Sequence, residues 1–146
     1  MGTLRQDRGP RRAGPRGLRV DRWQPRLCAG ATDSRTSAWD VWLGRQGVCR
    51  DYTHLAISFC RALSIPARYV GGYAVGLEPM DFHACFEAWL GGEWRLFDPT
   101  DHIVPENIAV ISRGRDATSA ALTTIFGRVT PAPVKVTCVV AAASIS

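Results

Sequence analysis

"GVCRDYTHLAISFCRALSIPARYVGGY", residues 47–73, is the stretch that decides the fold. Its apolar side chains recur with the period of one face of an α-helix, at Tyr52, Leu55, Ala56, Phe59, Cys60 and Leu63. The pattern predicts a helix from about Cys49 to Leu63, because Pro66 cannot continue it. Cys60 lies within the apolar stripe, so we expect it to be an inert core thiol.

Cys49 occupies the expected first turn of this helix. The backbone N–H groups of a first turn have no partner within the helix, and with the helix dipole they stabilise an anion. A thiolate is therefore favoured at Cys49, and we expect Asp51 to help cap the same turn. Cys49 is then either a nucleophile or a small apolar residue that packs at a helix start.

The segments on either side of this helix predict a second helix and a strand. Thr36 or Ser37 is expected to cap a short helix that ends near Gly44 or Gly47. Residues 67–75, "ARYVGGYAV", predict a strand that its glycine pair breaks.

The C-terminal part of the chain predicts mostly irregular structure followed by strands. Residues 101–120 are rich in turn-forming residues and predict loops, and residues 121–129 and 134–140 predict two closing strands. A helix followed by several antiparallel strands, rather than alternating strands and helices, indicates an α+β fold.

Residues 81–100, "DFHACFEAWLGGEWRLFDPT", predict a β-hairpin with Gly91-Gly92 as its two-residue turn. That turn makes His83 and Asp98 diagonal neighbours on one face, with Cβ atoms about 7 Å apart. An imidazole and a carboxylate can close this gap, so Asp98 is expected to orient His83. A slip of one residue would send the two side chains to opposite faces.

Cys49, His83 and Asp98 together predict a thiol acyl-transfer site. The thiolate would be the nucleophile, the imidazole the base and then the acid, and the carboxylate the group that fixes the imidazole tautomer. Small domains often contain a stray cysteine and histidine, so a packed core histidine and a turn-forming aspartate are the alternatives.

Three other residues compete for these roles. Asp101 is the nearest rival to Asp98 as the orienting group, and His102 is a second possible base. His54 is not expected to be the base, because five residues along a helix turn it about 140° away from Cys49.

Three sequence blocks resemble the transglutaminase-like superfamily, specifically its bacterial branch described as cysteine proteases. They are a Gly-x-Cys at a helix start, a His-Ala on a strand and a Trp-x-x-x-Asp-Pro-Thr on the next strand, and the resemblance covers roughly residues 36–127. It implies a papain-like fold in which a cysteine-bearing helix packs on an antiparallel sheet. It also implies that Cys49 is the nucleophile, His83 the base and Asp98 the orienting residue.

The chain departs from the family pattern at two places. Cys85 stands where the family usually has an aromatic residue, two positions after the histidine. The family's bacterial members carry a large β-rich segment ahead of the cysteine helix, so the resemblance implies a truncated relative.

Charge and composition divide the chain of 146 residues into a tail and one domain. Residues 1–35 hold nine arginines and three aspartates, a net charge of +6, whereas the rest of the chain has a net charge of −1. The Arg/Gly/Pro-rich residues 1–35 are expected to be a disordered tail and residues 36–146 the domain. The tail could bind nucleic acid, but it lacks the interleaved aromatic residues that stack on bases, so this is not expected.

The chain shows no targeting segment and no apolar run that could span a bilayer, so we expect a cytoplasmic protein without a membrane partner. Its five cysteines contain no CxxC pair, so neither a disulfide framework nor a zinc knuckle is indicated. No acidic cluster indicates a calcium site, and we expect neither a metal nor a cofactor.

The sequence therefore predicts thiol-dependent acyl transfer on a peptide or protein amide. Hydrolysis of the thioester would make the chain a cysteine peptidase or amidase, and attack by a lysine amine would make it a transglutaminase; we favour hydrolysis. The backbone N–H of Cys49 is the expected oxyanion donor. The alternative from another class is a catalytically inactive interaction module on the same scaffold.

Overall fold

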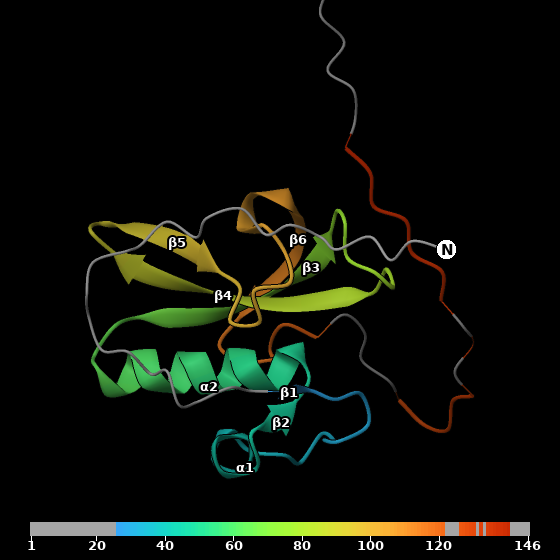
Figure 1. Ribbon diagram of the computed structural model, residues 1–146, viewed down its shortest axis with the longest axis horizontal. Helices are drawn as coiled ribbons and strands as arrows, with labels where there is room; N and C mark the ends of the chain where they lie inside the picture. Colours follow the sequence, from blue (N-terminus) through green and yellow to red (C-terminus); the bar gives the residue numbers. More distant parts are fainter. Residues whose placement is uncertain (1–25, 122–125, 131, 133, 141–146) are drawn as a thin grey trace, which may run out of the picture.

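The computed structural model describes residues 26–121, 126–130, 132 and 134–140. An antiparallel sheet with the strand order β5-β4-β3-β6 forms one layer; α2 lies along one face of it, and α1 packs on the side of α2 away from the sheet (Figure 1). The elements are β1 (Arg26–Leu27), α1 (Ala38–Gly44), β2 (Gln46–Gly47), α2 (Cys49–Ala62), β3 (Ala67–Ala74), β4 (Phe82–Leu90), β5 (Glu93–Phe97), a 3-10 turn (Pro105–Asn107) and β6 (Ile108–Gly114). The predicted α+β fold, with the cysteine helix on an antiparallel sheet, is confirmed.

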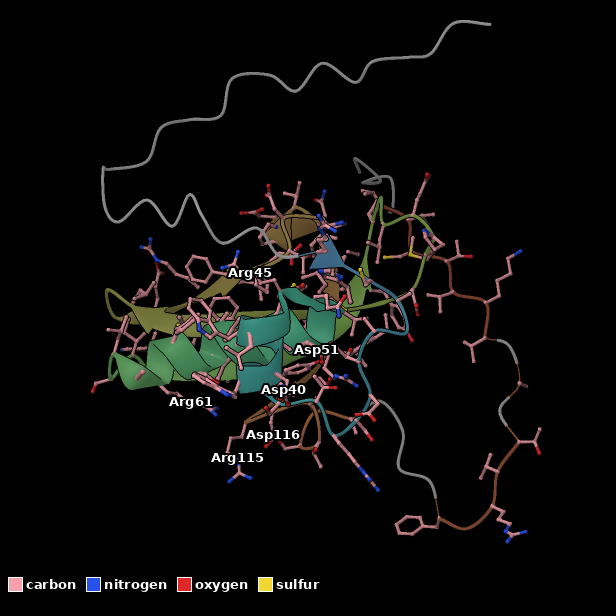
Figure 2. All side chains as sticks on the ribbon, turned by 60° about the horizontal axis from the view of Figure 1, so that its bottom comes forward. Asp40, Arg45, Asp51, Arg61, Arg115 and Asp116 are labelled. Atoms are coloured by element: carbon pink, nitrogen blue, oxygen red, sulfur yellow. The ribbon has the colours of Figure 1, made fainter. Side chains whose placement is uncertain are left out.

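Both helices begin where their capping residues require. Ser37, rather than Thr36, is the N-cap of α1: its backbone N–H donates to Asp40 Oδ2 at 2.9 Å, and the Asp40 N–H donates to Ser37 Oγ at 3.3 Å. In α2 the carboxylate of Asp51 accepts the N–H of Val48 at 2.9 Å. Figure 2 shows Asp51 at the first turn of α2 and Arg61 at its last turn, the signs that the helix dipole favours.

The apolar stripe predicted for α2 is buried only in its first half. Tyr52 and Leu55 pack against α1, but Phe59 is 47% exposed and Leu63 is 72% exposed. The second half of the stripe was therefore predicted wrongly: α1 is only seven residues long, and its Trp42 ring meets the Phe59 ring edge-on without burying it. Cys60 is likewise partly exposed rather than a core residue, and its partial burial raises the pKa of its thiol.

The sequence predicted that the glycine pair breaks this strand, but β3 runs through both glycines. The pair instead lets other elements approach the strand closely. A Cβ at Gly71 would lie 2.3 Å from the Phe82 ring, and a Cβ at Gly72 would lie 2.3 Å from the Ala109 carbonyl oxygen. The pairing of β3 with β6 shifts by one residue between the two glycines. Only glycine fits both positions of this crowded strand.

The last described strand, β6, lies where the sequence predicted loops. Residues 108–114 pair antiparallel with β3, which makes them one edge of the sheet. Conversely, the closing strands predicted at 121–129 and 134–140 are wrong for the described residues of these segments, none of which is in a strand. Residues 122–125 of the first segment lie outside the described residues.

The hairpin of β4 and β5 has the predicted register. Leu90 pairs with Glu93 and Phe86 with Phe97, and both turn glycines have positive φ values, 63° at Gly91 and 88° at Gly92. Two successive left-handed residues are typical of a type I′ turn, which suits the twist of the strands that it joins.

Residues 26–35, which the sequence analysis assigned to the tail, contact the domain. Arg26 pairs with Gln46 in the β1–β2 ladder, and its carbonyl accepts the Tyr52 hydroxyl at 2.7 Å. The carbonyl of Asp33 accepts a hydrogen bond from the Arg50 guanidinium at 2.7 Å. These bonds place residues 26–35 with the folded domain, and the rest of the predicted tail, residues 1–25, lies outside the described residues.

The described helices are also too short or too polar for a membrane: none of them combines the length and the apolar character that crossing a bilayer requires.

Candidate active site

Cys49 is the first residue of α2, and its neighbours explain the Gly-x-Cys pattern. A Cβ at Gly47 would lie 3.0 Å from Asp51 Oδ2, so glycine makes room for this carboxylate to fold back onto the helix start. There Asp51, which is 1% exposed, accepts hydrogen bonds from the Val48 N–H and the Arg50 side chain. The turn that carries the thiol is therefore held by a fully bonded buried carboxylate.

The structure brings His83 and Asp98 together. His83 Nε2 lies 3.1 Å from Asp98 Oδ1, and the two side chains are only 4% and 2% exposed. The last residue pair of the hairpin is Phe86 and Phe97, so His83 lies beyond the end of β5, on an open edge of β4. Asp98 follows β5 directly and reaches this edge from the next turn.

The carboxylate of Asp98 accepts four hydrogen bonds beside its ion pair with His83. Oδ1 accepts the N–H and the hydroxyl of Thr100 at 2.9 and 2.7 Å, and Oδ2 accepts the N–H groups of His102 and Ile103 at 2.9 and 3.0 Å. The turn-forming role that the sequence offered as an alternative thus coexists with the contact to His83. The hydrogen bonds from the turn at residues 100–103 fix the position of the carboxylate that pairs with His83.

The rival residues lie elsewhere. Asp101 is exposed and has a φ of 56°, and the exposed His102 places its Nδ1 2.7 Å from the Thr100 carbonyl oxygen. His54 Nε2 accepts the N–H of Ala117 at 3.0 Å, and burial, with the charge of Arg50, lowers the pKa of its imidazole. His54 therefore serves as a neutral acceptor that anchors the loop around Ala117.

His83 also lies within hydrogen-bonding reach of two thiols, those of Cys49 and Cys85. Burial by itself would lower the pKa of His83, but Asp98 and the two thiols outweigh it and raise this pKa well above its usual value. Burial would raise the pKa of Asp98, but His83 and Thr100 hold it below its usual range. The two side chains therefore form a buried imidazolium–carboxylate pair next to the Cys49 thiol.

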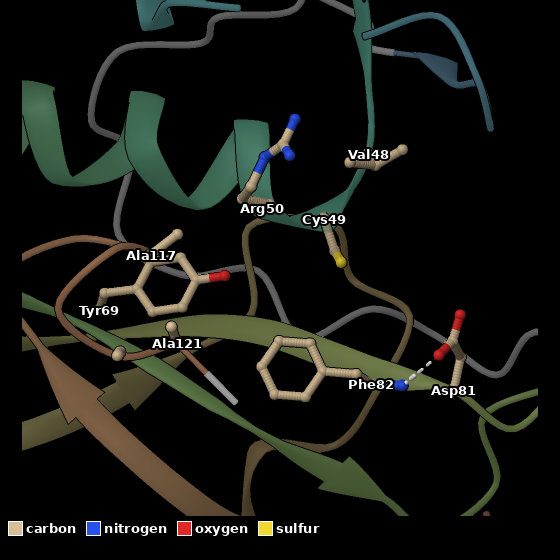
Figure 3. A pocket seen from close by; sticks show the side chains of 9 residues that line it. Val48, Cys49, Arg50, Tyr69, Asp81, Phe82, Ala117 and Ala121 are labelled. Atoms are coloured by element: carbon tan, nitrogen blue, oxygen red, sulfur yellow. Dashed lines mark hydrogen bonds between the residues drawn. The ribbon is translucent and has the colours of Figure 1, made fainter. Parts of the chain in front are cut away.

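A cavity of about 420 Å³ opens beside Cys49 (Figure 3). The Cys49 sulfur points into it, between the Phe82 ring and the side of the cavity where Asp81 lies, and the Tyr69 hydroxyl points into it from the opposite wall. Burial, with the nearby charges, chiefly at Cys49, raises the pKa of Tyr69, so its hydroxyl stays protonated and can donate.

The sequence pattern alone does not single out Tyr69. It lies on β3, which pairs with β4, so only the sheet register brings it next to the cysteine helix. The available signal was its place in an apolar run directly after that helix, which indicates burial but not a role.

One group of described residues could ligate a metal ion. His83, Cys85 and Asp98 each offer one donor atom, and these atoms lie within 4.8 Å of one another. Cys85, which is 0% exposed, has a pKa that burial raises and the nearby His83 lowers, with a net increase.

Comparisons with known proteins match the fold to a family and to a solved structure. The family model described as the transglutaminase-like superfamily matches residues 22–99. A solved structure of a putative cysteine protease from Cytophaga hutchinsonii superposes with a TM-score of 0.70 and 52% identity, over 72% of this chain and 36% of that one.

Two mycobacterial relatives add to these matches. An uncharacterised Mycobacterium leprae protein is 34% identical over 121 residues, 77% of this chain and 43% of the relative. An uncharacterised Mycobacterium tuberculosis protein is 34% identical over 105 residues, 60% of this chain and 33% of the relative. The chain thus spans less than half the length of each of these three proteins.

Proposed function

This chain belongs to the transglutaminase-like superfamily, and we propose that it is a thiol-dependent enzyme that cleaves peptide or isopeptide amides. The observation that carries the proposal is the His83 imidazole, which contacts both the Cys49 thiol and the Asp98 carboxylate in a buried setting. On one side of the His83 ring, Cys49 borders a cavity that can admit an acyl group. On the other side, the Asp98 side chain is buried and closed to solvent. Substrate therefore reaches the sulfur without disturbing the orienting carboxylate.

Acylation uses the proton that His83 holds. The Cys49 thiolate attacks the amide carbonyl carbon, and a C–S bond forms. As the C–N bond breaks, the His83 imidazolium gives its proton to the departing nitrogen, so an amine leaves and a thioester stays on Cys49. Asp98 keeps the ring oriented and stabilises the imidazolium that exists before this transfer.

Deacylation runs the same groups in reverse. The neutral His83 takes a proton from water, the hydroxide attacks the thioester, and the carboxylic acid leaves as the Cys49 thiolate is restored. The likeness to a protein described as a cysteine protease favours water as the acceptor. A lysine amine in place of water would give transamidation, and product analysis with and without an added primary amine separates the two.

Two donors are placed to stabilise the oxyanion. The backbone N–H of Cys49 is free of an intrahelical partner because it opens α2. The Tyr69 hydroxyl is the second donor that we propose, because it points into the same cavity as the sulfur. The other walls are mostly apolar, which suits an uncharged acyl side chain.

Selective alkylation tests the proposal and separates it from an inactive interaction module. The full chain is treated with iodoacetamide at about pH 6, and the five cysteines are mapped by mass spectrometry. We expect Cys49 to react at least about tenfold faster than glutathione, and His83→Ala to abolish the advantage. Cys60, at the far end of α2, is the internal control, and Cys60→Ser should leave the rate at Cys49 unchanged.

The interaction module gives the opposite result: labelling of Cys49 no faster than glutathione, with or without His83. The expectation that the tail does not bind nucleic acid is tested separately, by mixing the full chain with single-stranded RNA at low salt; tight binding with a steep salt dependence would contradict it.

A further inference from the structure

Cys85 lies beside the catalytic pair without a part in the chemistry described above. It is two residues after His83 on β4, so the two side chains leave the same face of the strand. Cys85 is 0% exposed and His83 is 3% exposed. The Cys85 sulfur, a ring nitrogen of His83 and a carboxylate oxygen of Asp98 all lie within 4.8 Å of one another. A thiol, an imidazole and a carboxylate thus converge in the interior.

The bonding of His83 is a second, independent observation. Its Nε2 atom is fully buried and makes no aligned hydrogen bond with any described residue, although Asp98 Oδ1 is only 3.1 Å away. Two ligands of a tetrahedral zinc ion stand about 3.3 Å apart without pointing at each other. His83 Nε2 and Asp98 Oδ1 therefore already have nearly the spacing of two ligands of one cation, and they do not point at each other as hydrogen-bond partners would.

We propose that His83, Cys85 and Asp98 form a binding site for a thiophilic divalent cation such as Zn²⁺, and that its occupation blocks acyl transfer by Cys49. The binding half stands on the geometry alone, and the inhibitory half rests on the proposed function. The ion is an inhibitor in this account, so the chemistry needs no metal.

The donor set selects the class of ion. One sulfur, one nitrogen and one oxygen donor suit Zn²⁺ or Co²⁺, whereas Mg²⁺ and Ca²⁺ prefer oxygen donors alone. A thiolate and a carboxylate balance the two positive charges, so the occupied site is neutral and can be buried. Bringing the sulfur to a zinc–ligand spacing of roughly 3.6 Å from the other donors needs a movement of about 1 Å.

The surrounding residues support the carboxylate as a ligand. Thr100 donates two hydrogen bonds to Asp98 Oδ1, and the backbone of His102 and Ile103 holds Oδ2. Such hydrogen bonds orient metal ligands and are commonly worth about 10- to 100-fold in affinity. The carboxylate is therefore already held beside His83 Nε2, where an ion would share the two groups.

An ion at this site would disable His83. Its Nε2 would hold the metal instead of a proton, and Cys85 and His83 would give up their protons to solvent on binding. The imidazolium that protonates the departing amine could then no longer form. Cys49 contacts His83 but is not one of the three metal-binding residues. Its acyl-transfer reaction would therefore stop although the ion does not bind its sulfur.

Cobalt titration of the full chain tests the binding half. We expect Co²⁺ to produce a sulfur-to-metal charge-transfer band and intense tetrahedral d–d bands, which Zn²⁺ then removes. Cys85→Ser and Cys85→Ala should each lose the charge-transfer band, whereas Cys49→Ser and the control Cys60→Ser should keep it. A band that persists in both Cys85 variants and disappears in Cys49→Ser would overturn the proposal, because the ion would sit on the nucleophile.

A measurement on the unaltered chain covers the case in which the Cys85 variants fail to fold. X-ray absorption of the Zn²⁺-loaded chain should show one sulfur in the coordination shell, with nitrogen and oxygen donors. A shell with two sulfurs, or with none, would contradict the site. This result does not depend on whether the chain is an enzyme.

Alkylation tests the inhibitory half. Equimolar Zn²⁺ should slow the reaction of Cys49 with iodoacetamide at least about tenfold in the unaltered chain and less than about twofold in Cys85→Ser. Equal slowing in both would refute the switch. Cobalt bands without selective alkylation of Cys49 would instead refute the proposed function and leave the metal site standing.

Discussion

Asp98→Asn tests the electrostatic core of the site with a change of one atom. The carboxylate accepts four hydrogen bonds and pairs with His83 Nε2, but an amide offers one oxygen and one NH₂ group. The amide oxygen must take the place of Oδ2, where the His102 and Ile103 N–H groups cannot move away. The NH₂ group then faces the Thr100 N–H and His83 Nε2, and the ring must be neutral with Nε2 as acceptor.

The cost follows from these contacts. The Thr100 N–H loses its acceptor, which costs about 1–3 kcal/mol, and the buried imidazolium loses its counter-charge. We expect a total loss of about 3 kcal/mol near pH 6, or roughly 6–12 °C in Tm. His83 would hold its proton on Nδ1 alone and lose the stabilised imidazolium, so the rate of acyl transfer should fall about 10³- to 10⁴-fold.

The loss of stability has a predictable dependence on pH. The pKa of His83 is raised above its usual 6.5, so its contribution is complete below about pH 6.5 and declines as the pH rises toward the folded value. The pKa of Asp98 is lowered from its usual 3.8, so its contribution is complete above about pH 4 and is lost in acid. The pair therefore stabilises most between about pH 4 and 6.5.

Urea unfolding of the unaltered chain and of Asp98→Asn at pH 6 and pH 9 measures this difference. The destabilisation should be smaller at pH 9 than at pH 6, and the NMR titration of the His83 ring should move to lower pH in the variant. Equal destabilisation at the two pH values, with an unchanged His83 titration, would refute the imidazolium–carboxylate pair.

Three further substitutions test the elements that position the site. Gly47→Ala places a Cβ 3.0 Å from Asp51 Oδ2, so urea unfolding should show a loss of about 1–3 kcal/mol together with slower alkylation of Cys49; no change in either would show that the carboxylate can move aside. Tyr69→Phe removes the proposed oxyanion donor and should lower kcat about 10- to 100-fold with little change in KM, whereas an effect on KM alone would make the hydroxyl a binding group. Gly72→Ala drives a Cβ to 2.3 Å from the Ala109 carbonyl oxygen, so β6 should detach or the chain fail to fold, and a Tm within 2 °C of the unaltered chain would contradict the observed sheet pairing.

Local patterns predicted the parts of the fold that bear the site. The limits of α2 follow from its capping and from Pro66, and the glycine turn at 91–92 fixes the register that brings His83 near Asp98. Each signal lies within about twenty residues of the chain. Helix termini and tight turns depend on neighbouring residues, so one sequence suffices to locate them.

The features that the sequence analysis missed depend on distant partners. Strand β6 is a strand because β3 offers it an edge, and the glycine pair of β3 is explained by the Phe82 ring and by Ala109. Phe59 stays 47% exposed because the short α1 meets it only edge-on, through the Trp42 ring. None of these partners is visible in the local pattern, and each must come from the packed chain.

Detection of an acyl thioester on Cys49 tests the central claim most directly. The full chain is mixed with p-nitrophenyl acetate, quenched in acid and mapped by mass spectrometry. We expect a single hydroxylamine-labile acetyl group on Cys49, formed at least about tenfold faster than in His83→Ala. Acetyl groups spread over Cys28, Cys60 and Cys138, or equal rates with and without the His83 imidazole, would contradict it.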